Sequence, residues 1–344
     1  MLVVRAITAN DLDALIDMAS QVGSGMTTLK PDRKMLGDRV KVAVASFAES
    51  IPPEQRDYMF VMEDTSNGKM AGVCAIKGAV GLDEPFYNYR IGTLVHSSRE
   101  LNVFTRMDTL YLSNDLTGST ELCSLFLHPD YRTGNNGRWL SKSRFLFIAQ
   151  FPQLFTEKLI AEMRGYQAED GSSPFYEGLG RHFFKMDFNH VDDLTALGKK
   201  SFIAELMPRQ PLYVAYLPDE AQNVIGMVHR STAPARRLLE QEGMHFEGYI
   251  DIFDAGPVLQ ARVSELRAMR DSVVVAADSG AIAADLEPTM VSNTVLQDFR
   301  MIVAHTVAAG GKIKLSTADL ALLHCGAGDP VRTLPLNLRK NAHV

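Results

Sequence analysis

A strand, a polar turn and a helix follow one another directly in the middle of the chain, and this succession constrains the fold more than any other feature. The apolar run from Glu121 to Leu127 predicts a strand, and the pattern from Gly137 to Ala149 predicts a helix. Between them the chain breaks at Pro129 and continues into Arg-Thr-Gly-Asn-Asn-Gly. The N–H groups in the first turn of such a helix lack partners and the helix dipole favours an anion there, so we predict a phosphate-binding turn.

The turn also has an ordinary interpretation, because Thr-Gly-Asn-Asn-Gly is common turn-forming composition. Two familiar phosphate motifs are excluded. A P-loop needs a Gly-Lys-Ser/Thr ending and a dinucleotide fingerprint needs G-x-G-x-x-G, and the turn has neither. A phosphate bound at this turn is therefore expected to belong to a ligand other than those bound by a P-loop or a dinucleotide fingerprint.

Strand and helix patterns alternate along the first 270 residues, without a low-complexity linker or an internal repeat. From about Asp271 the pattern changes to short β-like runs with glycine turns, which predicts a smaller β-rich module. We therefore expect two domains, residues 1–270 and 271–344. The predicted strands outside the central stretch are Val3–Ile7, Tyr58–Met62, Met70–Ile76, Leu159–Met163, Ser272–Ala276, Phe299–Thr306 and Lys312–Leu315, with helices expected to begin at Asn10-Asp11 and Ser173-Pro174.

The composition limits the class of protein. The chain has 344 residues, 46% of them hydrophobic, which is ample for a globular core, and its net charge of -6 comes without a Lys/Arg cluster, so we expect no nucleic-acid partner. No apolar window approaches the length of a membrane span and no export signal is apparent, so we expect a cytoplasmic protein. Three scattered cysteines indicate reduced thiols, and the histidines show no metal-ligand spacing, so no metal is expected.

The turn resembles the acyl-CoA-binding turn of the GNAT N-acyltransferase superfamily, which reads roughly Q/R-x-x-G-x-G/A after the central strand. Arg132, Asn135 and Gly137 fall on its three positions, with Gly134 displaced by one and Asn135 departing from the pattern. The stretch SPFYEGLGRHFF, from Ser173, resembles a later helix of the same fold.

Longer stretches narrow the resemblance to one family and span nearly the whole chain. EPFYNYRIGTLVHSSRELNV, NDLTGSTELCSLFL, IAELMP, IGMVH and YIDIFDAGP are together similar to the arginine N-succinyltransferase family. This resemblance implies an α/β (α+β) GNAT-like fold, with a mixed, mostly antiparallel sheet flanked by helices. It also implies transfer of succinyl from succinyl-CoA to the α-amine of L-arginine, with succinyl-CoA as co-substrate, no tightly bound cofactor, and a homodimer or a hetero-oligomer with a paralogous chain.

Two other functions stay open at this point. One is a related N-acyltransferase that acts on ornithine or another amine. The other is a weakly active CoA-binding subunit of a heteromer, since some relatives of this family occur as paired chains.

The GNAT resemblance assigns the acyl-CoA site to the edge of the central strand and to the turn. The backbone of Leu125, and secondarily that of Leu127, is expected to hold the pantetheine and thioester, although both leucines could simply be core residues. Arg132, Gly134, Asn135 and Gly137 are expected to bind the phosphates.

The resemblance also implies a proton donor for the leaving thiolate. His229, in the Val-His step of IGMVH, is the first candidate, because an imidazole can protonate a thiolate near neutral pH. Tyr176 is the alternative, although a tyrosine beside several phenylalanines is more often a packing residue.

Substrate contacts are the least readable part of the sequence. The free carboxylate of a succinyl group needs a cation, for which we name Arg90, helped by Ser97 or Ser98. The guanidinium of arginine needs a carboxylate, for which we name Asp251 or Asp254. The competing interpretation is that Arg90, Asp251 and Asp254 are charged surface residues that bind no ligand.

Overall fold

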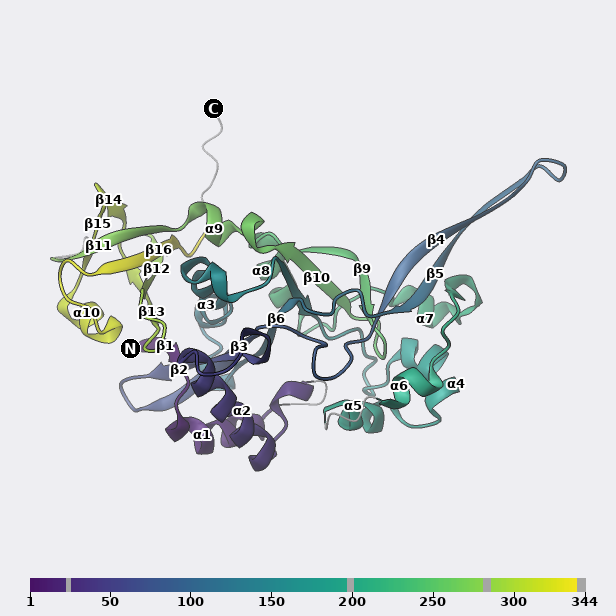
Figure 1. The fold of residues 1–344 in the computed structure, drawn as a ribbon, viewed down its shortest axis with the longest axis horizontal. Coiled ribbons are helices and arrows are strands. Elements are labelled where there is room, and N and C mark those ends of the chain that lie inside the picture. Colours follow the sequence, from purple (N-terminus) through teal and green to yellow (C-terminus); the bar gives the residue numbers. More distant parts are fainter. Residues whose placement is uncertain (23–25, 197–200, 281–285, 339–344) are drawn as a thin grey trace.

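One continuous sheet runs through the computed structural model, which describes residues 1–22, 26–196, 201–280 and 286–338 (Figure 1). The strand order is β14-β15-β11-β16-β12-β13-β1-β2-β3-β6-β7-β10-β9-β4-β5-β8. Only the pairs β6/β7 and β11/β15 among the described strands are parallel, so the predicted mixed, mostly antiparallel sheet is confirmed. The strands are β1 (Leu2–Ala6), β2 (Asp57–Asp64), β3 (Lys69–Lys77), β4 (Asn88–Ser98), β5 (Val103–Ser113), β6 (Thr120–Leu127), β7 (Lys158–Glu162), β8 (Leu212–Tyr213), β9 (His245–Asp251), β10 (Pro257–Arg262), β11 (Val273–Ser279), β12 (Pro288–Asn293), β13 (Arg300–His305), β14 (Ala308–Ala309), β15 (Lys312–Leu315) and β16 (Pro330–Pro335).

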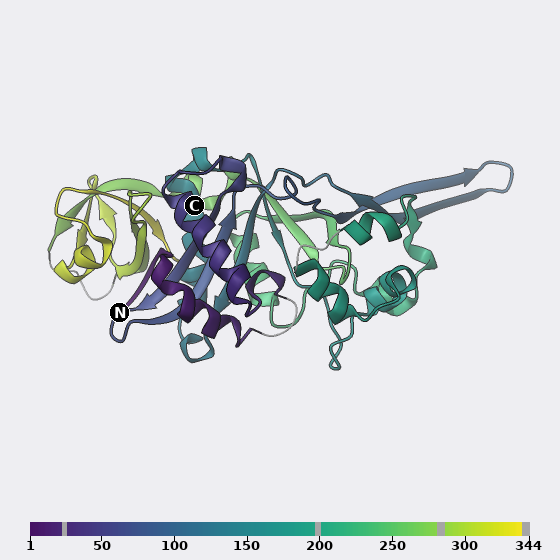
Figure 2. The same cartoon turned by 60° about the horizontal axis from the view of Figure 1, so that its bottom comes forward.

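Helices cover both faces of the central strands. On one face α1 and α2 lie across the sheet (Figure 2). They bury Leu15 and Leu36 against Val61 and Val73. On the other face α3 packs its Phe147 among aromatic side chains, including Phe60 of β2 at 4.8 Å between ring centroids. The helices are α1 (Leu12–Ala19), α2 (Arg33–Phe47), α3 (Asn136–Gln150), α4 (Arg181–Phe184), α5 (Phe188–Ala196), α6 (Ser201–Leu206), α7 (Asp219–Asn223), α8 (Ala233–Gln241), α9 (Arg267–Asp271) and α10 (Thr317–Leu323).

A second apolar core lies at the β9-β4-β5 end of the sheet. Short helices between residues 173 and 223 pack there, and Phe175 and Tyr176 are fully buried against Tyr89 and Ile250. The turn after Ser173-Pro174 forms a π-helix, Tyr176–Gly180, before α4. The predicted helix start is therefore confirmed, although the first turns are wider than an α-helix.

The C-terminal part has a core of its own and still belongs to the same sheet. Val291, Ile313 and Leu323 are buried together, and β13 pairs with β1 through Val4 and Met301. The three strands expected here are confirmed, whereas β12 and β16 were not predicted. The division at residue 270 stays a prediction.

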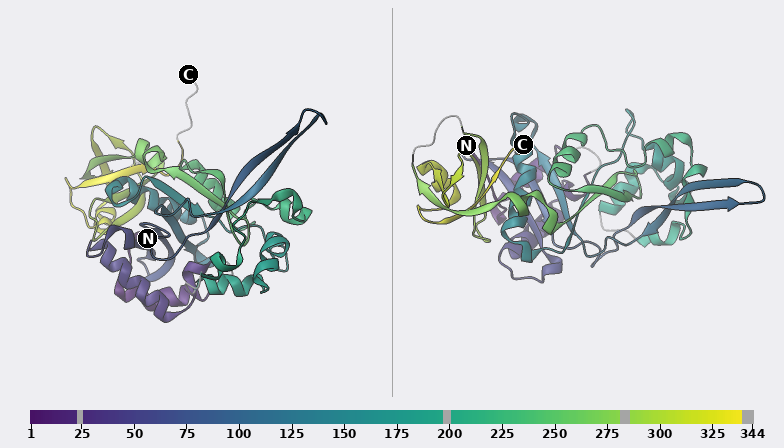
Figure 3. Two further views of the ribbon diagram at one scale, coloured as in Figure 1. Left: turned by 45° about the vertical axis from the view of Figure 1, so that its right-hand side comes forward. Right: turned by 90° about the horizontal axis from the view of Figure 1, so that it is seen from above.

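The strands β4 and β5 extend far beyond the body as a two-stranded arm (Figures 1 and 3). They pair along their whole length, from Asn88 opposite Ser113 to Ser98 opposite Val103. The body pairs only with the root of this hairpin. Among the described helices, none combines the length and apolar character that a membrane span requires.

Candidate active site

The parallel strands β6 and β7 separate soon after they meet. They pair only at Thr120 with Leu159 and at Glu121 with Ile160, while β6 continues to Leu127. If this register is continued, Arg164 stands level with Leu125 across the divergence. The edge of β6 that faces β7 is thus left without a strand partner beyond Glu121, and its predicted role in holding pantetheine stays a prediction.

A β-bulge at Ser124 lies in this open part of β6. Ser124 has a positive φ of 54°, and the pairing with β3 shifts register opposite it. Its buried hydroxyl accepts a hydrogen bond from Arg39 Nη1 at 2.7 Å and lies 2.9 Å from Thr28 Oγ1, while Arg39 also pairs with Asp57 at 2.6 Å. A bulge re-aims the strand edge, and this network fixes it in place.

The side chains of Leu125 and Leu127 pack against the main core, in agreement with the interpretation of both leucines as core residues. Their backbone nevertheless lies on the open edge. Both roles hold at once, because a strand residue uses its side chain and its peptide groups in perpendicular directions.

The turn before α3 is preformed, and its amides are unused. Gly134 adopts a φ of 55°, and Asn135 precedes α3 without a side-chain cap. Among the described residues, no protein acceptor receives the N–H groups of Gly134, Asn135, Gly137 and Arg138. N–H groups without a protein acceptor at the positive end of a helix are of the kind that bind a phosphate, and binding of one by this turn stays a prediction.

Arg132 holds the turn against the open strand. Its Nε donates to the carbonyl of Leu127 at 3.0 Å, and its guanidinium lies 5.4 Å from the centre of the Phe126 ring. Arg132 thereby links the turn to the end of β6.

His229 lies on the β7 side of the opening between β6 and β7. Its backbone N–H donates to the carbonyl of Arg164 at 2.9 Å. The preceding Val228 forms an isolated antiparallel β-bridge with Gly165. Two backbone contacts therefore place the histidine beside Arg164 and Gly165, just beyond the end of β7. The sequence could not show this, because the contact joins segments more than sixty residues apart.

The surroundings of His229 fix its protonation state. Burial lowers the pKa of the imidazole, and the positive charges of Arg164 and Arg230 lower it further. Nδ1 accepts a hydrogen bond from the Ser231 N–H at 3.2 Å and lies 2.7 Å from the Ser231 hydroxyl. The neutral ring therefore carries its proton on Nε2, the nitrogen that remains for a ligand.

Tyr176 lies in a different environment. Its side chain is fully buried in the second core, and its hydroxyl donates to the carbonyl of Met186 at 3.0 Å. Burial raises the pKa of this phenol to about 12. The structure thus gives Tyr176 a packing role, and a catalytic one stays a prediction.

Asp251 and Asp254 hold the turn between β9 and β10 together. Asp251 Oδ1 accepts the N–H groups of Phe253 and Asp254 at 2.7 and 2.8 Å. The two oxygens of Asp254 accept the N–H groups of Gly256 and Gly165 at 2.9 and 2.7 Å. Burial raises the pKa of both carboxyls, and in Asp254 the neighbouring Asp251 adds to the effect. Their proposed contact with a guanidinium stays a prediction.

Arg90 lies on the root of the arm. It is exposed, 5.5 Å above the ring of Tyr111 and 3.9 Å from Asp115. Ser97 and Ser98 cannot assist it, because they lie farther out on the same strand, about 20 Å away at the strand rise per residue.

Sequence reasoning did not single out Glu162, the last residue of β7. The carboxylate is exposed, and the Asn88 amide, in a side chain only 1% exposed, donates to its Oε1 at 3.0 Å. It lies two residues before Arg164, whose carbonyl holds His229. The available signal was a charged residue inside the apolar run from Leu159 to Met163.

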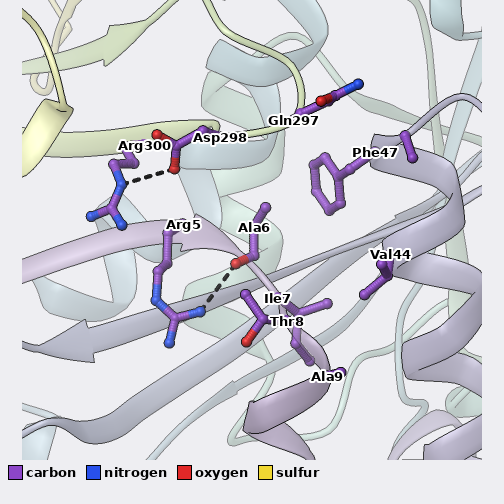
Figure 4. A pocket seen from close by; sticks show the side chains of 11 residues that line it. Arg5, Ala6, Ile7, Thr8, Ala9, Val44, Phe47, Gln297, Asp298 and Arg300 are labelled. Atoms are coloured by element: carbon purple, nitrogen blue, oxygen red, sulfur yellow. Dashed lines mark hydrogen bonds and ion pairs between the residues drawn. The ribbon is translucent and has the colours of Figure 1, made fainter.

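A separate pocket lies far along the sheet from this site. Arg5, Phe47 and Asp298 are among its lining residues, between β1, α2 and the loop before β13 (Figure 4). Arg5 already pairs with Asp11 and Glu63 at 2.8 and 2.6 Å, so its charge is matched within the chain. None of the predicted site residues lines it. Among the described residues no three His, Cys, Asp or Glu side chains gather as metal ligands.

An open strand edge beside a bare helix N-terminus, on a sheet of this order, defines an acyl-CoA N-acyltransferase of the GNAT-like fold. Family models described as "Arginine N-succinyltransferase beta subunit" and its C-terminal domain match residues 2–268 and 271–335. The chain belongs to the arginine N-succinyltransferase family, so the predicted membership is confirmed.

Individual relatives agree over the full length. The chain is 48% identical to an arginine N-succinyltransferase of Shigella sonnei over 337 residues, 98% of each chain. It is also 48% identical to the arginine N-succinyltransferase subunit beta of Pseudomonas aeruginosa, over 98% of this chain and 99% of the relative. A solved structure, the arginine/ornithine succinyltransferase subunit AI of Pseudomonas aeruginosa, superposes with a TM-score of 0.90 at 35% identity, covering 98% and 99% of the two chains.

Proposed function

We propose that the protein transfers the succinyl group of succinyl-CoA to the α-amine of L-arginine, giving N2-succinyl-L-arginine and CoA. The observation that carries the proposal is the combination of full-length similarity to named arginine N-succinyltransferases with an open strand edge next to unpaired helix amides. On this proposal the reaction is the first step of arginine catabolism by succinylation.

The acyl donor lies along β6 in this proposal. Its phosphates accept from the amides of Gly134, Asn135 and Gly137 and from Arg132, and its pantetheine follows the unpaired edge. The backbone at Leu125 supplies the N–H for the thioester oxygen, which becomes an oxyanion when the amine attacks. A fixed peptide donor stabilises this charge with little reorganisation.

His229 moves the proton in this proposal. The α-ammonium of the acceptor must lose a proton before attack, and the CoA thiolate must gain one when it leaves. Because its pKa is lowered, the ring is neutral in the free enzyme, with Nε2 already protonated, so it takes up the proton of the α-ammonium on Nδ1, through the Ser231 hydroxyl 2.7 Å away. The charged ring then donates its Nε2 proton to the thiolate and is left neutral, and the second proton of the amine goes to solvent.

For the cationic acceptor we propose Glu162 ahead of Asp251 and Asp254. Glu162 is exposed at the end of β7, whereas Asp254 is buried and Asp251 half-buried. Arg90 remains our proposal for the succinyl carboxylate.

The proposal extends to assembly and location. We propose that the chain works as an oligomer of at least two subunits, and one relative is itself named a subunit. Free cysteines at Cys74, Cys123 and Cys325 support a reducing, cytoplasmic location.

Release of free CoA thiol tests this function directly. The purified protein is supplied with succinyl-CoA or acetyl-CoA, and with L-arginine, L-ornithine or L-lysine. We expect thiol release with succinyl-CoA and arginine, and a loss of about 10²- to 10⁴-fold in kcat for His229→Ala with CoA binding retained. His182→Ala, in an exposed histidine of α4, is the matched control and should keep full activity.

Ornithine is the second candidate acceptor, because the superposing Pseudomonas protein is named an arginine/ornithine succinyltransferase. A higher kcat/KM for ornithine would transfer the proposal to that amine. Binding of succinyl-CoA without thiol release for any amine would contradict the enzymatic proposal and support a CoA-binding subunit that needs a partner chain.

A further inference from the structure

The arm, here residues 91–108 of β4 and β5, exposes an unusual amount of apolar surface. Phe104 is 72% exposed and Leu101 75%, and Val95 and Val103 are 53% and 49% exposed. Single exposed apolar residues are ordinary, but four within one short hairpin form a patch of the kind found at interfaces.

Both edges of the arm also lack partners. On the β4 side the body pairs only with Asn88–Arg90, and on the β5 side β8 pairs only with Thr109 and Leu110. An isolated two-stranded hairpin is marginally stable in water, and long unpaired edges accept further strands or surfaces. The arm is therefore expected to be covered in the working protein.

One face of the arm combines Phe104 and Val95 with two opposite charges, while Val103 lies on the other face and Leu101 in the turn. The register places Arg106 opposite Val95, Phe104 opposite Ser97 and Asp108 opposite Thr93, so these side chains share one face. Among the described residues neither Arg106 nor Asp108 has an ion-pair partner, and the Asp108 carboxylate accepts only from the Thr93 hydroxyl, at 3.3 Å.

We propose that this face of the arm binds the same face of a second copy of the chain. A two-fold axis brings identical patches together, so each contact is made twice. Because Arg106 and Asp108 are neighbours of opposite charge, the axis can set each arginine against the partner copy's aspartate. Since Phe104 lies nearer the tip than both charges, the phenylalanine of each copy packs outside the two ion pairs, toward the root of the partner copy's arm.

The charges favour a second copy over a strongly charged partner. The face carries one positive and one negative group, so it has no net charge with which to select a polyanion or a basic protein. A second copy matches both charges at once. The inference deepens the oligomer of the proposed function but does not depend on the acyl transfer, because an inactive protein can still dimerise through the arm.

Sedimentation equilibrium of the full chain tests the interface. We expect the wild type to form a dimer that dissociates on dilution. Arg106→Asp and Asp108→Arg each set like charges against each other and should raise the dissociation constant at least about tenfold. The double variant R106D/D108R restores opposite charges and should recover the dimer. That recovery could not come from a general loss of folding.

Two further variants complete the test. Phe104→Ser should also weaken the dimer, whereas Val307→Ser, at an exposed valine of the C-terminal part, should not. A monomeric wild type, or one that associates only with a different chain, overturns the proposal. A dimer that all arm variants leave intact overturns it too, because its interface then lies elsewhere. Thiol release measured on the same samples distinguishes a failed interface from a failed enzyme.

Discussion

At the scale of single residues, the site depends on His229 and on the charges around it. The backbone N–H of His229 donates to the carbonyl of Arg164, and the pKa of its ring is lowered by burial and by the nearby arginines. A lowered pKa means that the ring stays neutral until the pH falls below its ordinary value. We therefore expect kcat/KM to fall on the acid side as the ring becomes protonated, at a pH below the usual histidine range.

Arg230→Gln tests this account of the histidine. Removal of one positive charge takes away a cause of the lowering, so the pKa of His229 should rise and the acid limb of the kcat/KM profile should move to higher pH. Titration of the imidazole by NMR measures the same shift. Arg237→Gln changes an exposed arginine that does not contribute to the His229 pKa. It should leave that pKa and the acid limb of the kcat/KM profile unchanged. An unmoved limb in Arg230→Gln would show that another group sets it.

Glu162→Gln tests the acceptor site at the same scale. The amide keeps the shape and the contact with Asn88 but loses the charge that pairs with a cationic substrate. We expect the KM for L-arginine to rise by about 10- to 100-fold, with the KM for succinyl-CoA unchanged. Equal effects on both KM values would instead indicate a structural role for Glu162.

At the scale of elements, the unit of function is the path from β6 through the turn into α3. The bulge at Ser124, the contact of Arg132 with Leu127 and the bare amides after Gly134 all lie on this path. A Cβ on Gly137 would lie 3.6 Å from Leu127, an ordinary contact, so substitution there leaves the core intact.

Gly137→Asp should therefore act on the ligand alone. A carboxylate among the helix amides occupies the positive site and repels phosphate, so the KM for succinyl-CoA should rise about tenfold with little change in kcat. Gly137→Ala adds the same Cβ without the charge and should stay near the wild type. If the two variants behaved alike, steric crowding rather than charge would explain the change.

At the scale of the whole molecule, a buried ionic triad ties the acyltransferase part to the C-terminal part. Glu242 pairs with Lys142 of α3 at 2.7 Å and with Arg267 of α9 at 3.0 Å, and all three side chains are at most 3% exposed. Lys142 and Arg267 also donate to the carbonyls of Leu336 and Pro335, at the end of β16. The helix that carries the phosphate turn is thereby fixed to the last strand.

Glu242→Gln should consequently weaken the entire fold. It leaves two buried cations without a carboxylate, which costs about 3–5 kcal/mol of unfolding free energy. Denaturant unfolding measures this loss. Glu240→Gln, which removes a partly exposed pair with Arg236, is the matched control and should cost about 0.5 kcal/mol or less. Similar losses in both variants would argue against a special role for the triad.

Local patterns in the sequence determined the elements of the site and the family. The alternation of apolar residues set β6, and the turn composition set the start of α3, because both depend on neighbours within a few residues. Motifs spread along the chain were enough to identify the family and its GNAT-like fold. The strands of the C-terminal part were predicted where their apolar runs are continuous.

Only the tertiary structure decided which groups meet. The divergence of β6 from β7, the carbonyl of Arg164 that holds His229, and the Asn88 amide on Glu162 all join segments distant in sequence. The same holds for the burial of Tyr176 and for the use of Asp254 in a turn, which give these residues structural roles. Such contacts depend on how the sheet is closed and covered, and local sequence patterns carry no information about that packing.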